Sequence, residues 1–371
     1  MSGRQKGARG TASWAAVAVS VFGLLPACGD NRPAPAPLDS VSSCSAAWQP
    51  ILTLPGYDIT SPLAYRDGVL YYSTFATQAL TALPTGGGAG TTLATGYMPE
   101  LWLDGDQLIY TGGDRGNLIY SVPVAGGSPT LLLDSAAGRS TSGIALHHDF
   151  NATDFYWAED SSPDGATTVW RASRAGGTPV QIGLLTALDP GFPSETLPFM
   201  AIALSADAVL MAADLGVSYA VPFDGSAPRL LATADPLTKA KGNLAGLDPA
   251  GVYWTVPRAG ASAEDDEWSV ALAPTDGSPM RTFWQGTPAH SGVMGMWPTG
   301  DGAWILGAIQ LFDDQRFHLV VWMLAPDGTS QRLACSPAED FPVIQVKPAV
   351  TPDAVYVVAS ATPTQIVRIP R

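Results

Sequence analysis

The chain has 371 residues, of which 46% are hydrophobic, 9% aromatic and 14% charged. This composition is too apolar for a disordered protein, and 39 glycines with 32 prolines interrupt the chain too often for a helical one. The 19 basic and 33 acidic residues give a net charge of −14, which argues against nucleic acid as a partner. No apolar run of 18 residues follows residue 30, which excludes a protein with several membrane-spanning helices.

Residues 1–27 have the features of a secretory signal. Arg4, Lys6 and Arg9 precede an apolar stretch over 11–27 that contains no acidic residue. The stretch ends in Leu25-Pro26-Ala27-Cys28, which resembles the lipobox of bacterial lipoproteins. In that family the signal is cut before the cysteine, whose thiol receives a diacylglycerol. The resemblance implies a lipid anchor on Cys28 and a place in the bacterial cell envelope; a plain secretory signal or an uncleaved anchor is the alternative.

The residues that follow Cys28 predict a tether and a disulfide. Residues 28–47 are rich in Pro and Ser with hardly any large apolar side chain, as in an extended linker. They do not decide between inner and outer membrane, so we expect a periplasmic or surface-exposed domain held by its lipid anchor. Cys44 and Cys335 remain in the mature chain, and an exported compartment is oxidising, so they predict a disulfide. Two buried free thiols are the alternative.

From residue 48 the chain repeats one pattern seven times, at spacings of 39 to 54 residues. In each unit an apolar strand with aromatic residues is followed by a strand that ends near Pro, a Gly turn and a short closing strand. The apolar strands begin at Val69, Leu108, Phe155, Val209, Val252, Ala303 and Val355. A further strand precedes each of them, over 61–65, 100–104, 143–148, 201–205, 244–248, 293–297 and 343–347.

This pattern predicts a β-propeller. Consecutive apolar residues indicate strands that are buried on both faces, and Asp-Gly and Gly-Gly pairs supply the positive φ of tight hairpin turns. Four antiparallel strands in a unit of nearly 50 residues make one propeller blade. The predicted fold is therefore all-β, a seven-bladed propeller of four-stranded antiparallel blades over residues 48–371; six blades with an extra hairpin is the alternative.

The seventh unit lacks its outer strand, because the chain ends at Arg371. Residues 48–54 look like a stray strand, and we expect them to pair beside 366–369 and close the ring, which removes an open sheet edge. The predicted Cys44–Cys335 bridge would lie beside this seam. Segments such as IYSVPVAGG and WRASRAGG resemble the "RVP-x-GG" units of TolB-like repeats and of exported propeller lipoproteins of unassigned role. The resemblance covers residues 48–371 and implies the fold but no function.

Long insertions predict the working face. They fall at the propeller end that carries the blade-to-blade loops, where function is commonly found. The acids in these insertions are Glu159, Asp160, Asp164, Glu264, Asp265, Asp266, Glu267, Asp313 and Asp314. Together they predict a negative field that attracts cations or a basic partner; solvated acidic loops are the alternative. Calcium could use such carboxylates, yet no D-x-D-x-D-G register occurs, so we expect no metal and no cofactor.

An apolar segment lies at the same end. Residues 183–199 carry Leu188 and Phe192 among prolines, which suits a ligand pocket or a protein contact; a loop packed down as a plug is the alternative.

Signals for catalysis are few. His290, in a blade-to-blade loop, is the best general-base candidate, although a bland surface histidine fits as well. His147 and His148 end an inner strand, so at least one is expected in the core or a turn, and His318 begins a third strand. Propellers resembling streptogramin lyases use His and Glu on this face, but no matching motif occurs. No G-x-S-x-G, H-E-x-x-H or phosphate loop is present.

The sequence thus favours a monomeric, membrane-anchored propeller outside the cytoplasm that binds a small ligand or an envelope protein, with neither identified. One alternative is a lyase or hydrolase that acts on an envelope polymer or small molecule through His290 and the rim acids. Another is an assembly factor of an envelope complex, which rests on analogy of fold alone.

Overall fold

The computed structural model describes residues 40–371, and all structural statements below concern these residues. The described range has gaps at 56–57, 60, 97–99, 114–115, 136–143, 162–165, 187–198, 214–216, 233–243, 258–267, 286–290, 315, 327–328, 338–345 and 360–362. The predicted signal, Cys28 and most of the predicted tether lie outside it. No helix among the described residues is long and apolar enough to cross a membrane.

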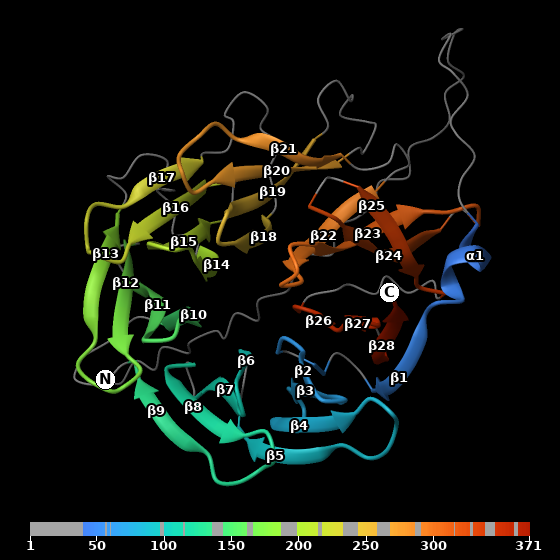
Figure 1. Ribbon diagram of the computed structural model, residues 1–371, viewed down its shortest axis with the longest axis horizontal. Coiled ribbons are helices and arrows are strands. Elements are labelled where there is room, and N and C mark those ends of the chain that lie inside the picture. Colours follow the sequence, from blue (N-terminus) through green and yellow to red (C-terminus); the bar gives the residue numbers. More distant parts are fainter. Residues whose placement is uncertain are drawn as a thin grey trace, which may run out of the picture. The chain divides into compact units, whose positions relative to one another are not determined.

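The described residues form seven four-stranded antiparallel sheets, arranged as the blades of a propeller (Figure 1). The first blade has strands β2 (Ala64–Arg66), β3 (Val69–Thr74), β4 (Ala79–Pro84) and β5 (Thr91–Thr95). The second has β6 (Leu101–Asp104), β7 (Gln107–Gly112), β8 (Leu118–Pro123) and β9 (Thr130–Asp134). The third has β10 (Ile144–Phe150), β11 (Asp154–Ser161), β12 (Ala166–Ser173) and β13 (Val180–Leu185).

The next three blades follow the same order from the axis outward. The fourth has β14 (Phe199–Leu204), β15 (Ala208–Ala213), β16 (Val217–Pro222) and β17 (Arg229–Ala232). The fifth has β18 (Leu244–Asp248), β19 (Gly251–Pro257), β20 (Trp268–Pro274) and β21 (Arg281–Gln285). The sixth has β22 (Ser291–Pro298), β23 (Trp304–Leu311), β24 (Phe317–Leu324) and β25 (Ser330–Cys335).

The seventh blade joins the two ends of the described chain. It holds β26 (Ala349–Val350), β27 (Ala354–Ala359) and β28 (Thr364–Pro370), and its outer strand is β1 (Gln49–Leu54). The prediction of seven blades closed by the N-terminal strand is confirmed, and the six-bladed alternative is wrong. Of the inner strand expected over 343–347, residues 343–345 lie outside the described range. The inner strand that the structure describes is the two-residue β26, which begins after Pro348; this proline has no N–H to give to a ladder.

The second strand of each blade is buried on both faces, as its apolar run predicts. In the first blade Leu70, Tyr71 and Tyr72 follow one another and are at most 4% exposed. Hydrophobic clusters lie between neighbouring blades: Tyr156 and Val169 of the third blade pack with Met211 and Tyr219 of the fourth. Each blade therefore depends on the next for its core, which fixes the inner strands around a common axis.

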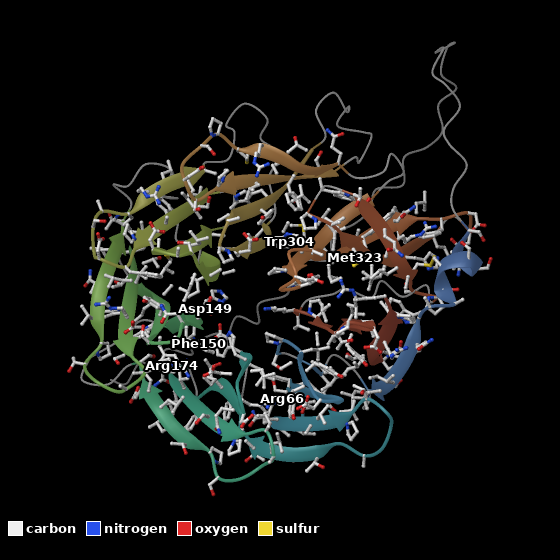
Figure 2. All side chains as sticks on the ribbon, viewed as in Figure 1. Arg66, Asp149, Phe150, Arg174, Trp304 and Met323 are labelled. Atoms are coloured by element: carbon white, nitrogen blue, oxygen red, sulfur yellow. A yellow bond between two sulfur atoms is a disulfide. The ribbon has the colours of Figure 1, made fainter. Side chains whose placement is uncertain are left out.

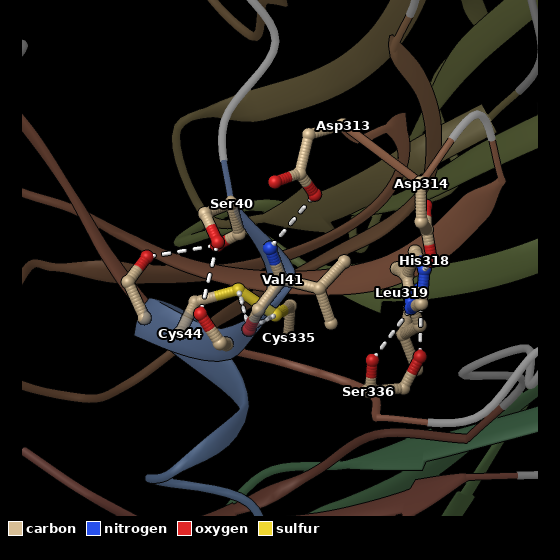
Figure 3. Close-up of a disulfide and its surroundings, with 11 residues drawn as sticks. Ser40, Val41, Cys44, Asp313, Asp314, His318, Leu319, Cys335 and Ser336 are labelled. Atoms are coloured by element: carbon tan, nitrogen blue, oxygen red, sulfur yellow. Dashed lines mark hydrogen bonds and ion pairs between the residues drawn. A yellow bond between two sulfur atoms is a disulfide. The ribbon is translucent and has the colours of Figure 1, made fainter.

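The ring closes through a strand pair and a covalent bond. Leu52 of β1 lies opposite Ile366 of β28, and Gln49 lies opposite Arg368. The short helix α1 (Val41–Ser45) precedes β1 and carries Cys44, whose disulfide to Cys335 reaches the outer strand of the sixth blade (Figure 3). The predicted bridge is confirmed, and it spans the seam beside the seventh blade.

Candidate functional site

A cavity of about 550 Å³ lies on the propeller axis. Its wall comes from the inner strands β6, β10, β14, β18 and β22, with Lys347 just before β26. Trp102, Met294 and Trp297 give it apolar surface, Asp149 of β10 gives it a carboxyl group, and the neighbouring His148 also belongs to the wall. A cavity of this size and composition, with a few converging polar groups, is typical of small-molecule sites.

The side chain of His148 is held by Glu100, which directly precedes β6. The Nδ1 atom of His148 lies 2.7 Å from Oε2 of Glu100, and the backbone N–H of His148 donates to Oε1 at 3.1 Å. His147 approaches the same carboxylate more loosely, with 3.7 Å between its Nδ1 and Oε1. The buried Thr111 fixes Glu100 in turn, because its hydroxyl accepts from the Glu100 N–H and its own N–H donates to the Glu100 carbonyl, both at 3.2 Å.

These contacts set the charge of Glu100 and the tautomer of His148. Burial acts to raise the pKa of Glu100, but the charge and hydrogen bonds of His148 and His147 outweigh it and lower the pKa to about 2. An ionised carboxylate can only accept, so Nδ1 of His148 carries a proton.

The Nε2 atom of His148 is buried and has no hydrogen-bond partner among the described residues. The His148 side chain is only 2% exposed and its ring stacks on Trp157, with 6.5 Å between ring centroids. A buried polar atom without a partner costs on the order of 1–3 kcal/mol, and it calls for a missing donor or acceptor. This orphaned nitrogen belongs to a residue of the cavity wall.

Asp149 is the second ionisable group that β10 brings to the cavity (Figure 2). Burial raises its pKa to about 6, against smaller lowering effects from the backbone amide of Phe150, Lys347 and a backbone hydrogen bond at Leu204. The Phe150 N–H donates to Oδ1 of Asp149 at 2.8 Å. The adjoining turn is anchored by Arg174, whose guanidinium stacks on Phe150 at 4.9 Å and pairs with Asp104.

Four of the five inner strands that line the cavity, all but β6, have an irregular pairing with the next strand. Register shifts occur in β10 at Ala145/His147, in β14 at Phe199/Ala201, in β18 at Leu244/Gly246 and in β22 at Val293/Gly295. A β-bulge bends a strand and re-aims the side chains next to it, and bulges are over-represented beside functional sites. The cavity is thus formed by a repeated deviation from regular pairing.

The predicted acidic face is only partly described. Of the insertion expected over 159–168, residues 159–161 belong to strand β11 and residues 166–168 to strand β12, while 162–165 lie outside the described residues. Glu159 is buried within β11, and the backbone of Asp160 pairs with Thr167. Several residues expected on this face lie outside the described range: Asp164, Glu264, Asp265, Asp266, Glu267, Leu188 and Phe192. The general-base candidate His290 also lies outside it.

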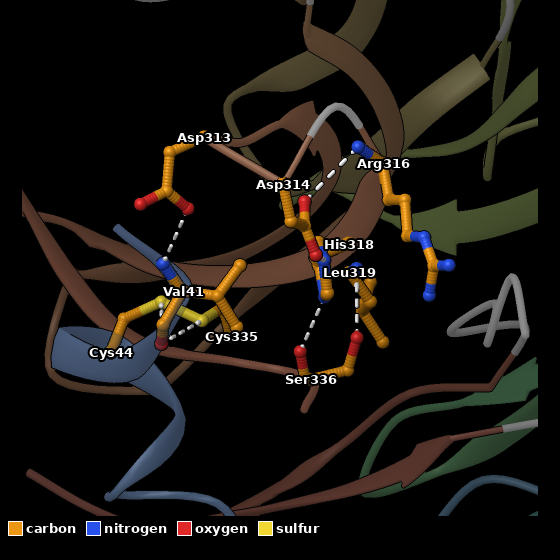
Figure 4. A network of polar contacts seen from close by, with 9 residues as sticks. All are labelled: Val41, Cys44, Asp313, Asp314, Arg316, His318, Leu319, Cys335 and Ser336. Atoms are coloured by element: carbon orange, nitrogen blue, oxygen red, sulfur yellow. Dashed lines mark hydrogen bonds and ion pairs between the residues drawn. A yellow bond between two sulfur atoms is a disulfide. The ribbon is translucent and has the colours of Figure 1, made fainter. Parts of the chain in front are cut away.

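Asp313 contacts the closure of the ring, whereas Asp314 contacts His318 of its own blade (Figure 4). Oδ1 of Asp313 accepts from the backbone N–H of Val41, at 3.4 Å, next to the disulfide. Asp314 lies 2.9 Å from Nε2 of the buried His318, whose Nδ1 lies 2.7 Å from the carbonyl of Ser336. Among the described residues, no group of three His, Cys, Asp or Glu is placed to hold a metal ion.

Sequence reasoning placed His147 and His148 in the core or a turn and overlooked Glu100, Asp149 and Lys347. The available signal was His147-His148-Asp149, three titratable residues in a row within an inner strand. Most other inner strands are dominated by apolar residues, as in AIALS and VMGMW. Burying such a polar run at the axis of a propeller costs free energy, which indicates that these residues have a functional role.

Solved structures of other proteins share this fold. Virginiamycin B lyase from Staphylococcus aureus matches with a TM-score of 0.54 at 10% identity, over 85% of this chain and 97% of that one. Oligogalacturonate lyase from Vibrio parahaemolyticus matches with a TM-score of 0.59 at 10% identity, over 86% and 90%. No protein-family model and no curated protein matches the chain. These likenesses extend to bacterial β-propellers and, at such identity, concern the fold alone.

Proposed function

We propose that this protein is an exported, lipid-anchored propeller that binds a small ligand in its axial cavity. The lipobox-like segment before Cys28 and the disulfide between Cys44 and Cys335 support an oxidising compartment outside the cytoplasm. The cavity supports binding of a small molecule by its volume and lining. The acidic residues of the predicted working face and the segment 183–199 remain candidates for a second contact, with an envelope protein. If the protein takes part in the assembly of an envelope complex, it would use this second contact.

One observation carries the binding proposal: Nε2 of His148 is buried at the cavity wall without a partner among the described residues. A ligand group that bonds to this nitrogen would remove the cost of leaving it unpaired. The Glu100 carboxylate fixes the ring, so the nitrogen is held in place before the ligand arrives. Such preorganisation limits the entropy lost on binding.

The test is to recover the ligand with the protein. The mature chain is incubated with a bacterial envelope extract, repurified and examined by native mass spectrometry for a bound small molecule. We expect a mass adduct that is lost in His148→Ala and kept in Thr282→Ala, a substitution on the exposed face of β21. An adduct that His148→Ala retains at full occupancy, or no adduct with either chain, contradicts the proposal.

The anchor is tested separately. Cys28→Ser removes the only thiol that the lipobox-like segment offers for lipidation. We expect the unaltered chain to partition into the membrane fraction and the variant to leave it or to retain its signal. Equal membrane partitioning of a processed Cys28→Ser chain would show that the lipid is not the anchor.

A second candidate function is acid–base catalysis in the same cavity. The favouring observation is the Glu100–His148 pair, in which Nδ1 is hydrogen-bonded to a carboxylate and Nε2 is left as the base. Two proteins that share the fold are lyases, named for virginiamycin B and oligogalacturonate. Both compounds are therefore suitable first substrates for a turnover assay.

For catalysis, we expect turnover to fall about 10²- to 10⁴-fold in His148→Ala, as is usual for loss of a general base. Glu100→Gln should lower kcat with a smaller effect on KM, because it disturbs the position of His148. Turnover that survives in His148→Ala and disappears in His290→Ala would return the role to the candidate that the sequence favours. Absence of turnover leaves the binding proposal to its own test.

A further inference from the structure

The cavity wall offers a hydrogen-bond acceptor in the carboxylate of Asp149 on β10. Asp149 presents a carboxylate that is in contact with backbone amides, and no ion pair to it is found among the described residues. A ligand that satisfies this carboxylate must supply donors, and a positive donor would offset the cost of burying the Asp149 charge.

The walls and the overall charge favour the same kind of ligand. Trp102 and Trp297 contribute indole rings and Met294 contributes a thioether. Indole faces attract cations, and polarizable methionine side chains adapt to irregular apolar shapes. The chain also carries a net charge of −14, which raises the local concentration of cations and lowers that of anions.

We propose that the ligand of the axial cavity is an organic amine in its ammonium form, whose N–H groups bond to Asp149 while its carbon skeleton packs on Trp102 and Trp297. This inference rests on the proposed binding function and names the class of its ligand. A cavity of about 550 Å³ admits an amine with an aromatic ring or a branched alkyl chain.

Lys347 is the one cation of the cavity wall among the described residues, and it opposes a positive ligand. It is exposed, and its flexible stem allows the ammonium to turn toward solvent. Because its charge also stabilises the Asp149 carboxylate, Lys347 holds Asp149 ready in its charged form before an amine arrives. Because Lys347 also repels a positive ligand, removing it should strengthen amine binding at a pH where Asp149 is fully ionised.

The proposal predicts weaker binding in acid. As the pH falls through about 6, Asp149 takes up a proton and no longer attracts an ammonium group. Glu100, whose charge adds to the raising of the Asp149 pKa, is paired with His148 and His147 and stays ionised because its own pKa is lowered to about 2.

The experiment is calorimetric titration of the mature chain at pH 7.5 with four amines: tyramine, choline, spermidine and hexylamine. 4-Hydroxyphenylacetate, an acid in place of tyramine, is the matched control ligand. We expect at least one amine to bind, with affinity at least tenfold lower in Asp149→Asn, raised in Lys347→Met and unchanged in Thr282→Ala. Affinity should fall at least fivefold at pH 5.0 in the unaltered chain and less in Asp149→Asn.

The outcomes separate this inference from the binding proposal. If no amine binds, or if the acid binds more tightly and depends on Lys347, the ligand is not an ammonium compound. An envelope ligand that depends on His148 but lacks a basic nitrogen would likewise overturn the amine assignment while supporting the axial site. If neither the envelope extract nor any probe gives binding, the proposed function itself fails.

Discussion

Two carboxyl groups of the axial site have their pKa values shifted in opposite directions by their surroundings. For Glu100, burial is opposed and outweighed by two histidines, and the pKa is about 2. For Asp149, burial is opposed only by backbone amides and the exposed Lys347, and the pKa is about 6. A pair of acids separated in this way is a common feature of sites that bind or transfer protons.

The raised pKa of Asp149 makes a prediction about stability. A carboxyl with a folded pKa near 6 and an unfolded value of 3.8 binds more protons in the folded state between these values. Its contribution to the free energy of unfolding is therefore present at low pH and is lost as the pH rises from about 4 to 6. We expect Asp149→Asn to raise this free energy by about 1–3 kcal/mol at pH 7.5 and to leave it unchanged at pH 4.

Urea unfolding of both chains at the two pH values measures this difference. Asp248 of β18 also has a pKa raised by burial, so Asp248→Asn tests whether any partly buried acid gives the same result. A stability gain in Asp149→Asn at pH 4 equal to that at pH 7.5 would mean that charge is not the cause.

Glu100 predicts the opposite dependence on pH. Its folded pKa of about 2 lies below the ordinary 4.5, so its contribution is complete above pH 4.5 and is lost as the pH falls toward 2. We expect Glu100→Gln to lower the free energy of unfolding by about 1–3 kcal/mol at pH 7 and by progressively less below pH 4. Denaturant unfolding from pH 7 to pH 3 measures the trend, and a constant loss over this range contradicts it.

The sequence reveals these residues only in part. The run His147-His148-Asp149 is visible as an unusual polar interruption of an inner strand. Its partner Glu100 is 48 residues away from His148, and nothing local marks the glutamate as the group that orients the ring. The distance between them follows from the packing of the second blade against the third, which the repeat predicts as a pattern but not at the level of side chains.

At the scale of elements, the strands follow from residue type and the bulges do not. Apolar pairs such as Val252-Tyr253 and turns such as Asp67-Gly68 identify strands and hairpins directly, and both turn residues have positive φ, at 47° and 81°. The register shifts of the inner strands have no comparable motif. They arise where strands converge on the axis and backbones approach closely, as the contact at Gly246 shows.

Gly246 of β18 predicts a strict requirement for glycine. A Cβ atom at this position would lie 2.2 Å from the carbonyl oxygen of Met296 in β22, and backbone cannot yield as a side chain can. We expect Gly246→Ala to force the inner strands of the fifth and sixth blades apart and to lower the free energy of unfolding by about 1–3 kcal/mol.

Gly292, also in β22, is a matched control, because a Cβ atom there would meet nothing within 4 Å. Gly292→Ala should leave the thermal unfolding midpoint nearly unchanged. If the two variants have equal thermal unfolding midpoints, the inner strands can move apart at Gly246 without loss of stability, and the prediction is wrong. Because Gly246 and Met296 both line the cavity, Gly246→Ala should also weaken ligand binding, which reports on the geometry of the wall.

For the whole molecule, closure of the ring combines three kinds of interaction. The pairing of β1 with β28 supplies a ladder, and Trp48 is 7% exposed in the core shared by the last two blades. The disulfide then joins residues 291 positions apart. The composition of residues 48–54 and the pair of cysteines were enough to predict this closure. The N-terminal strand has no blade of its own, and the seventh blade is the one that lacks an outer strand, so the two are expected to pair.

Removing the disulfide that closes the ring should lower the free energy of unfolding. A disulfide stabilises mainly by restricting the unfolded chain, and losing one commonly costs about 2–5 kcal/mol. We expect the double substitution Cys44→Ser and Cys335→Ser to lower the free energy of unfolding by that amount without opening the ring, because Trp48 and β1 keep their contacts. Cys28→Ser, which removes the cysteine outside the bridge, is the control.

Truncation before residue 55 tests the strand itself, because it removes β1 and Trp48 together with Cys44. The outer edge of β28 would then be exposed as a row of unpaired backbone groups, and such an edge promotes association between chains. We expect the truncated chain to form concentration-dependent oligomers by light scattering while the double cysteine variant stays monomeric. Monomers of the truncated chain with unchanged stability would show that the seventh blade is complete without its N-terminal strand.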